Sequence, residues 1–152
     1  DIGCGLGDIF GFIKEETEAK VDYTGVDRVE EFIEVAKVRY PDAKFKALDY
    51  YASPLSQKYE VVVCSGALSS DLGSETLNEL SRKKAIKMMF EAAKEVCCFN
   101  MLGGVGKWAN VSKKNVYYTD LKEILNYCYS LTTKIILRNN YRKNDFTIIL
   151  FK

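Results

Sequence analysis

The chain contains no histidine among its 152 residues and only two prolines. Without histidine, a zinc site of the Cys/His type is excluded, and no two cysteines stand in a C-x-x-C pair. No apolar run approaches the roughly 20 residues of a membrane-spanning helix, and no signal peptide is visible. We therefore expect a cytoplasmic protein with no metal site and no membrane segment.

A strong excess of one charge is also missing. Lys and Arg number 22 against 21 Asp and Glu, so the net charge is +1. A partner such as nucleic acid or an anionic membrane would favour a basic surface, and neither is indicated here. The hydrophobic fraction of 47% and the charged fraction of 28% are typical of a globular protein, and we expect a single domain over residues 1–152. The five cysteines are an odd number and lie mostly in apolar stretches, which indicates buried free thiols in a reducing compartment.

Apolar clusters alternate with amphipathic stretches along the whole chain. Helical periodicity follows residue 7 and covers 30–40, 78–96 and 120–131. Strands are predicted at 23–27, 43–48, 60–64 and 97–102, followed by a loop at 103–115 and a closing antiparallel hairpin of 134–137 with 146–151. The β-branched run at 60–64 is typical of a strand buried on both faces. This order of elements predicts a three-layer α/β sandwich.

The first seven residues, D-I-G-C-G-L-G, hold three glycines in a G-x-G-x-G pattern. Such a turn lets the backbone approach a ligand that any Cβ would push away. The dinucleotide fingerprint needs its third glycine at position 8, where Asp8 stands, and an acid at this helix start would repel a pyrophosphate. Asp27 ends the next predicted strand, twenty residues after Gly7, and is placed to accept hydrogen bonds from ribose hydroxyls. The pattern therefore predicts a nucleoside ligand without phosphates.

Four motifs together resemble the class I S-adenosylmethionine-dependent methyltransferases. They are D-I-G-C-G-L-G at 1–7, T-G-V-D at 24–27, A-L-D-Y at 47–50 and V-V-C-S-G at 62–66. The resemblance covers nearly the whole chain, including the closing hairpin. It implies a Rossmann-like, mostly parallel seven-stranded sheet of order 3-2-1-4-5-7-6 with an antiparallel last strand.

The resemblance also implies a set of residues that bind S-adenosylmethionine. The turn of Asp1, Gly3, Cys4 and Gly5 would line the methionine portion, Asp27 the ribose, Asp49 with Arg28 and Tyr50 the adenine, and Ser65 with Gly66 the sulfonium side.

The sequence departs from the family pattern in two places. The hydrophobic first strand that normally leads into Asp1 is largely missing, and an empty central slot would cost far more than the roughly 5–15 kcal/mol that stabilises a domain. We therefore expect a truncated or incompletely recorded chain. The second departure follows the fourth strand, where residues 65–68 read S-G-A-L instead of the Asn/Asp-Pro-Pro-Tyr/Phe of enzymes that methylate nucleic-acid amines. There is also no Pro-Cys pair as in cytosine C5 enzymes, so a small-molecule acceptor is expected.

Methyl transfer to a hydroxyl or ammonium group usually needs a base, and histidine is not available. The candidates are Asp71 after the fourth strand, Tyr117 or Tyr118 before the late helix, and Tyr141 or Asp145 in the hairpin. Each also has a structural interpretation: the acids as cap or turn residues, the tyrosines as part of the edge of the core.

Three functional hypotheses remain open from the sequence. The first is a methyltransferase that acts on a small-molecule O- or N-nucleophile by in-line displacement. The second is a regulatory module that binds S-adenosylmethionine without methyltransferase activity. The third is an NAD-dependent oxidoreductase, against which Asp8 argues.

Overall fold

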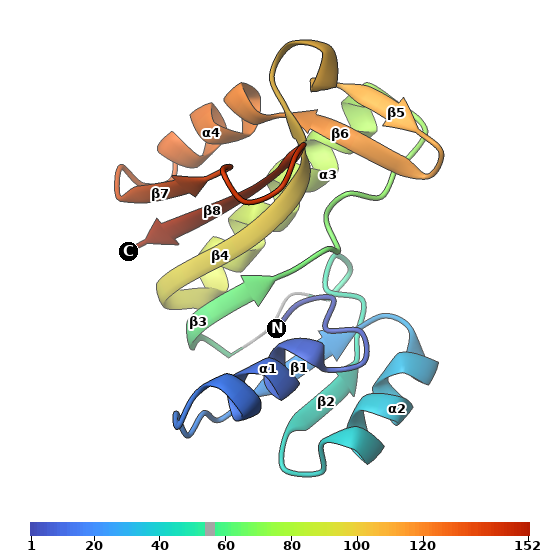
Figure 1. Cartoon of the computed structure of the whole chain (residues 1–152), viewed down its shortest axis with the longest axis vertical. Helices are drawn as coiled ribbons and strands as arrows, with labels where there is room; N and C mark the ends of the chain where they lie inside the picture. Colours follow the sequence, from blue (N-terminus) through green and yellow to red (C-terminus); the bar gives the residue numbers. More distant parts are fainter. Residues whose placement is uncertain (54–56) are drawn as a thin grey trace. The chain divides into compact units, whose positions relative to one another are not determined.

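The computed structural model describes residues 1–53 and 57–152 of the chain (Figure 1). Contacts divide the chain into two compact units, unit 1 (Asp1–Leu55) and unit 2 (Ser56–Lys152). A single domain over 1–152 remains a prediction. In the described part of the chain, no helix combines the length and the apolar character needed to cross a lipid bilayer.

Unit 1 consists of two helices and two parallel strands. Its elements are α1 (Asp8–Glu16), β1 (Thr24–Asp27), α2 (Glu30–Arg39) and β2 (Lys44–Ala47). The register pairs Thr24 with Lys44 and Asp27 with Ala47, so that both strands end at the same edge. Ile2 forms an isolated parallel bridge with Val26 on β1.

The core of unit 1 is aromatic. The ring of Phe10 lies 4.9 Å from that of Tyr23 and 5.5 Å from that of Tyr40 between centroids. The buried cluster also contains Cys4, Ile33, Ala36 and Phe45, and Tyr40 packs against it half-buried. Offset and edge-to-face aromatic pairs of this kind stabilise a core beyond the area that they bury. The core therefore holds α1 and α2 against the two strands.

Unit 2 is built around the long strand β4 (Ala93–Gly104). The sheet order is β5 (Val111–Lys113), β6 (Val116–Asp120), β4, β8 (Asp145–Phe151) and β7 (Ile135–Arg138), and β3 (Tyr59–Cys64) also pairs with β4. β3 and β6 are parallel to β4, whereas β8 is antiparallel to both β4 and β7. The predicted closing hairpin is therefore confirmed. The strand pairs within each unit agree with the expected order, and the full seven-strand order remains a prediction.

Two helices and a short 3-10 turn complete unit 2: α3 (Glu75–Ala92), α4 (Leu121–Tyr129) and η1 (Gly106–Trp108). Ser74 caps α3 by accepting a hydrogen bond from the Leu77 N–H, and Asp120 caps α4 by accepting one from the Lys122 N–H. Side-chain oxygens at these positions satisfy N–H groups that the helix leaves unpaired.

Three details of the sequence prediction are wrong. α3 ends at Ala92 instead of residue 96, because residues 93–96 belong to β4, where Val96 pairs with Val61 and Phe151. The predicted loop at 103–115 contains the end of β4, η1 and β5. Val61 is 53% exposed while Val62 and Cys64 are buried, so β3 is packed on one face and not on both.

Candidate functional site

The three glycines of the first turn all adopt left-handed backbone conformations. The φ angles are 69° at Gly3, 53° at Gly5 and 82° at Gly7, a region that residues with a Cβ enter at a cost. A Cβ on Gly7 would lie 2.9 Å from Cδ2 of Tyr40, so this glycine also serves packing. A Cβ on Gly5 would meet nothing within 4 Å. The space beside Gly5 is therefore open, as a ligand site requires.

Asp27 binds this turn to the carboxyl end of β1. Its Oδ2 accepts the Gly5 N–H at 3.0 Å and its Oδ1 accepts the Val29 N–H at 3.0 Å. The N–H groups of Gly3 and Cys4 both donate to the carbonyl oxygen of Val26, at 2.8 and 3.1 Å. Each carboxylate oxygen can accept a second hydrogen bond, so Asp27 keeps capacity for a ligand hydroxyl.

Two buried groups of unit 1 lie at the turn: the Tyr23 hydroxyl and the Cys4 thiol. The hydroxyl of Tyr23 donates to Oδ2 of Asp1, and burial raises the pKa of this tyrosine. Burial, followed by the charge of Asp27, raises the pKa of the Cys4 thiol to about 11. The thiol is therefore neutral at physiological pH. In the part of the chain that the structure describes, no cluster of His, Cys, Asp or Glu is suited to a metal ion.

The end of β2 brings Asp49 to the same edge of unit 1. The Leu48 N–H donates to the carbonyl oxygen of Asp27 at 2.8 Å, which places the two strand ends side by side. Oδ1 of Asp49 accepts the Tyr51 N–H at 2.9 Å. Asp49 and Arg28 are exposed and Tyr50 is buried. Unit 1 thus brings together the predicted residues from Asp1 to Gly5 with Asp27 and Asp49.

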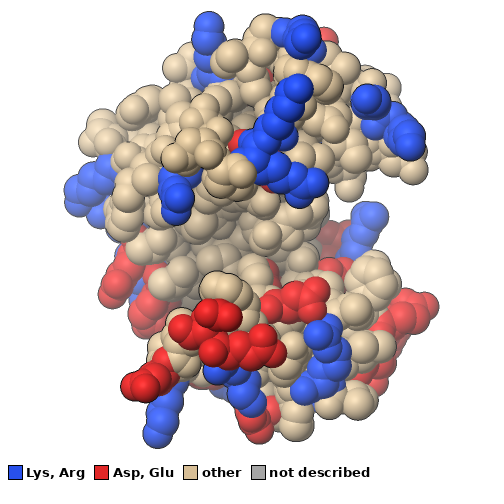
Figure 2. Space-filling model, viewed as in Figure 1, with Lys and Arg blue, Asp and Glu red and all other residues tan. Residues whose placement is uncertain are grey.

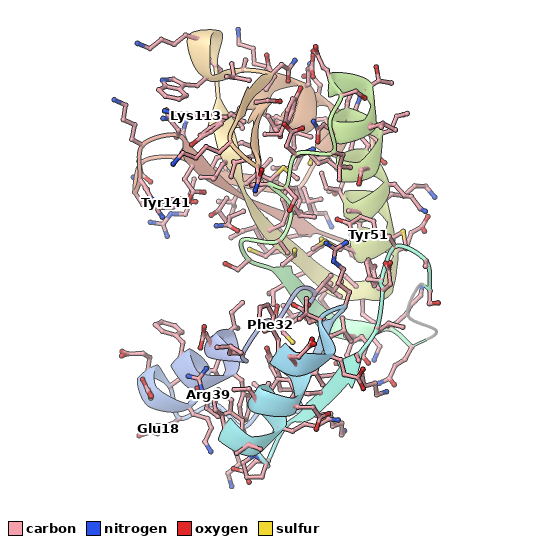
Figure 3. The ribbon with its side chains drawn as sticks, turned by 90° about the vertical axis from the view of Figure 1, so that its right-hand side faces the viewer. Glu18, Phe32, Arg39, Tyr51, Lys113 and Tyr141 are labelled. Carbon is pink, nitrogen blue, oxygen red and sulfur yellow. The ribbon has the colours of Figure 1, made fainter. Side chains whose placement is uncertain are left out.

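The structure modifies the argument from Asp8. Nη1 of Arg39 lies 2.8 Å from Oδ1 of Asp8 and 3.1 Å from the carbonyl oxygen of Leu6. Arg39 belongs to α2 and is labelled in Figure 3. The ion pair is exposed, so solvent screens it, but it offsets part of the negative charge at the start of α1. The case against a pyrophosphate therefore depends more on the glycine spacing than on this charge.

Ser65 and Gly66 lie in unit 2, in a second exposed turn at the end of β3. Gly66 has a φ of 77°, and a Cβ there would meet nothing within 4 Å. Its N–H donates to Oδ1 of Asn100 at 2.7 Å. Sequence reasoning missed Asn100, although an amide inside the apolar strand of 97–102 was a visible signal.

The side chain of Asp71 stabilises the loop in which it lies, by hydrogen bonds. Its Oδ1 accepts the Gly73 N–H at 2.9 Å and Nδ2 of the fully buried Asn78 at 2.8 Å. The hydrogen bond from Asn78 is the main cause that lowers the pKa of Asp71. A carboxylate stabilised in this way is a weaker base, which favours its structural interpretation.

The tyrosines of β6 differ from each other. Tyr117 is buried, which raises its pKa to about 12, and its ring lies under the guanidinium of Arg82. Tyr118 is half-buried, with its ring centroid 5.4 Å from that of Trp108. Trp108 therefore packs on β6.

Tyr141 and Asp145 are the two catalytic candidates that the structure brings together. The hydroxyl of Tyr141 donates to Oδ1 of Asp145 at 3.0 Å and lies 2.8 Å from Oγ1 of Thr147. Asp145 is buried at the start of β8, and Tyr141 is exposed in the turn before it.

Comparison with known proteins agrees with this architecture. A family model described as "Methyltransferase domain" matches residues 1–95. The chain is 25% identical over 154 residues to "Putative methyltransferase Rv1506c" of Mycobacterium tuberculosis, which covers 100% of the chain and 91% of that protein. It is 35% identical over 63 residues to "Putative methyltransferase 235L" of Invertebrate iridescent virus 6, which covers 41% of the chain and 23% of that protein.

Solved structures show the same fold. Magnesium protoporphyrin IX methyltransferase of Synechocystis PCC 6803, solved with bound SAH, superposes with a TM-score of 0.73 at 13% identity, over 100% of this chain and 72% of that one. The amino pentose methyltransferase CalS10 of Micromonospora echinaspora, solved with SAM, gives 0.72 at 11% identity, over 99% and 81%. The predicted Rossmann-like α/β fold is confirmed. Since the family model matches more than half of its residues, the chain belongs to the methyltransferase domain family.

Proposed function

We propose that this chain binds S-adenosylmethionine at the glycine turn of unit 1 and transfers its methyl group to a small molecule. One observation carries the proposal: Gly5 combines a left-handed backbone, an open space and an N–H held by Asp27. Membership of the methyltransferase domain family and the SAM or SAH present in solved relatives support it.

In this proposal Asp27 accepts the ribose hydroxyls through the lone pairs that Gly5 and Val29 leave unused. Asp49 and Tyr50, with Arg28, bind the adenine, and the turn from Asp1 to Gly5 receives the methionine portion. The second turn, Ser65–Gly66, faces the sulfonium. Arg28 and Asp49 are exposed, so they are free to meet a ligand.

The chemistry is an in-line displacement. A nucleophilic oxygen or nitrogen of the acceptor attacks the methyl carbon, and the electrons of the breaking C–S bond remain on sulfur. Because the sulfonium leaves as a neutral thioether, the protein's main contributions are to hold the two reactants in line and to receive a proton. The buried free thiols are consistent with a reducing compartment, and we place the protein in the cytoplasm.

Isothermal titration calorimetry with S-adenosylmethionine, S-adenosylhomocysteine and NAD tests the proposal. We expect both sulfur ligands to bind and NAD not to bind. Asp27→Asn should weaken S-adenosylhomocysteine binding at least tenfold, since charge-assisted hydrogen bonds are worth about 1.5–3 kcal/mol. Asp22→Asn is the control, because among the residues that the structure describes Asp22 pairs with exposed Lys44 alone.

Each other outcome has a defined meaning. Binding of NAD alone would replace the assignment with an oxidoreductase. S-Adenosylmethionine binding without turnover across a broad set of metabolites would indicate the regulatory module. Unchanged affinity in Asp27→Asn, at an unchanged melting temperature, would refute the ribose role.

A further inference from the structure

Unit 2 contains a buried carboxylate that is partly held by its own neighbours. Asp145 is 7% exposed, and its Oδ1 accepts the hydroxyl proton of Tyr141 at 3.0 Å. A tyrosine has one proton to donate, so the hydroxyl of Thr147, 2.8 Å away, donates to Tyr141 in turn. Although the residue is exposed, partial desolvation raises the pKa of the Tyr141 hydroxyl, which keeps it protonated as a donor. The Tyr141–Thr147 pair thereby fixes the orientation of the Asp145 carboxylate.

The second oxygen of this carboxylate has no such partner. Among residues 1–53 and 57–152, none donates a hydrogen bond to Oδ2 of Asp145. Oδ2 of Asp145 is not among the fully buried polar atoms that lack a hydrogen-bond partner, so it reaches solvent at the surface of unit 2. An oriented oxygen with unused lone pairs is suited to accept a proton or a hydrogen bond from a bound molecule.

The position of Asp145 in the sheet links it to the second glycine turn. Thr147 lies directly opposite Asn100 in the β4–β8 register, and side chains of opposite residues share one face of a sheet about 5 Å apart. Oδ1 of Asn100 accepts the N–H of Gly66 at 2.7 Å. On the proposed function, which this inference takes as its starting point, that turn faces the sulfonium. Within unit 2, Asp145 and this turn lie at the same end of the sheet, because β3 ends just before the turn and Asp145 pairs with Leu102 near the end of β4.

The net charge of unit 2 favours an acidic methyl acceptor over a basic one. Unit 2 has fifteen Lys and Arg against nine Asp and Glu, a net charge of +6, whereas unit 1 has seven against twelve, a net charge of −5. Lys and Arg side chains are spread over the face of unit 2 that is seen in Figure 2. An ammonium acceptor would be repelled from such a field, and an acidic molecule would be attracted.

Two of these cations, Arg142 and Lys143, lie in the turn directly before Asp145. Three more lie elsewhere in unit 2: Lys107 in η1, Lys113 at the end of β5 and Lys114 in the turn between β5 and β6. All five are exposed, and none forms an ion pair with a residue that the structure describes. Lys113 and Tyr141 lie on the same side of unit 2 in Figure 3. The positive charge of Arg142 and Lys143 is therefore available to a ligand at Asp145, and the other three add to the positive field of unit 2.

We propose that the methyl acceptor is a negatively charged hydroxyl compound and that Asp145 is its catalytic base. The acceptor hydroxyl donates to Oδ2 of Asp145, while its acidic group interacts with the surrounding Lys and Arg side chains. The hydroxyl oxygen attacks the methyl carbon, the C–S bond breaks with its electrons on sulfur, and the hydroxyl proton passes to the carboxylate. The products are a methyl ether, S-adenosylhomocysteine and protonated Asp145, which returns its proton to water. Tyr141 is a positioning residue that aims the carboxylate.

The test measures transfer of tritiated methyl from S-adenosylmethionine to four probes: gluconate, glucose 6-phosphate, glucose and ethanolamine. We expect label in gluconate or glucose 6-phosphate, at least tenfold more than in glucose, and none in ethanolamine. Asp145→Asn should lower kcat at least 100-fold. Tyr141→Phe should lower kcat about tenfold with little change in KM, and Arg142→Glu should mainly raise KM. Asn139→Ala, an exposed position in the same turn, is the control and should match the wild type.

Calorimetry with S-adenosylhomocysteine, on every variant, separates this inference from the proposed function. If the wild type does not bind it, the proposed function fails and the inference fails with it. If binding is intact, three results overturn the inference alone: label only in ethanolamine or glucose, no label in any probe, or Asp145→Asn within threefold of wild-type kcat. If Asp145→Asn does not fold, an unchanged kcat in Tyr141→Phe overturns it.

Discussion

Replacing Gly5 by alanine separates ligand binding from folding in unit 1. The φ of Gly5 is 53°, where a residue with a Cβ is disfavoured by about 1–2 kcal/mol. The new Cβ would meet no atom within 4 Å, so no steric cost is added. Since 1 kcal/mol lowers the melting temperature of a protein of this size by about 2–4 °C, Gly5→Ala should fold with a modest loss. The methyl group would occupy the space proposed for the cofactor, and binding should fall at least 100-fold.

Gly25→Ala is the matched comparison within the same unit. Gly25 lies in β1, and a Cβ there would be 2.8 Å from Sγ of Cys4 and 2.8 Å from Cδ1 of Phe45. Overpacking of this kind costs about 1–3 kcal/mol. This variant should lose as much stability as Gly5→Ala or more, because its Cβ adds crowding, and should lose far less affinity.

Thermal melting and calorimetry with S-adenosylhomocysteine on both variants provide the measurement. The reasoning predicts opposite rankings: Gly25→Ala lower in melting temperature, Gly5→Ala lower in affinity. If Gly5→Ala binds S-adenosylhomocysteine within threefold of the wild type while remaining folded, the open space beside Gly5 is not the cofactor site.

Further predictions concern the interior, alkaline pH and the second turn. Asn78→Ala should destabilise the protein by about 2–3 kcal/mol in chemical unfolding, because the Leu72 N–H and the Arg82 guanidinium lose the buried amide oxygen to which they donate. The side chain of Leu77 is 54% exposed, and Leu77→Ala should stay within about 0.5 kcal/mol of the wild type. The raised pKa of Cys4 means that the folded state keeps a proton that the unfolded chain loses, so stability should fall as pH rises from 9 to about 11. That fall should be shallower in Cys4→Ala melts, and an identical slope would contradict burial of the thiol. Asn100→Ala releases Gly66 and should weaken S-adenosylmethionine binding in calorimetry at least threefold; unchanged affinity would remove the second turn from the site.

Local features of the chain were predictable from sequence. The G-x-G-x-G turn follows from the need for left-handed backbone at Gly3, Gly5 and Gly7, which depends on these residues alone. The closing hairpin follows from alternating apolar residues around a polar turn. Asp27 could be assigned to the glycine turn because the apolar pattern of the predicted strand 23–27 ends at this residue. Its hydrogen bond with the Gly5 N–H agrees with that placement. The charge difference between the units was also present in the sequence, but opposite contributions cancel in the total of +1.

Other features depended on contacts between distant parts of the chain. Helical periodicity continues past Ala92, yet α3 ends there because pairing with β3 and β8 makes residues 93–96 a strand. Asp71 looked like a possible base until buried Asn78, seven residues away, was found to bind it. The role of Asp145 depends on Tyr141 and on a register that sets β8 beside β4. Spacing along the chain therefore determined the cofactor turn, whereas the acceptor side was decided by strand pairing and burial, which no local pattern specifies.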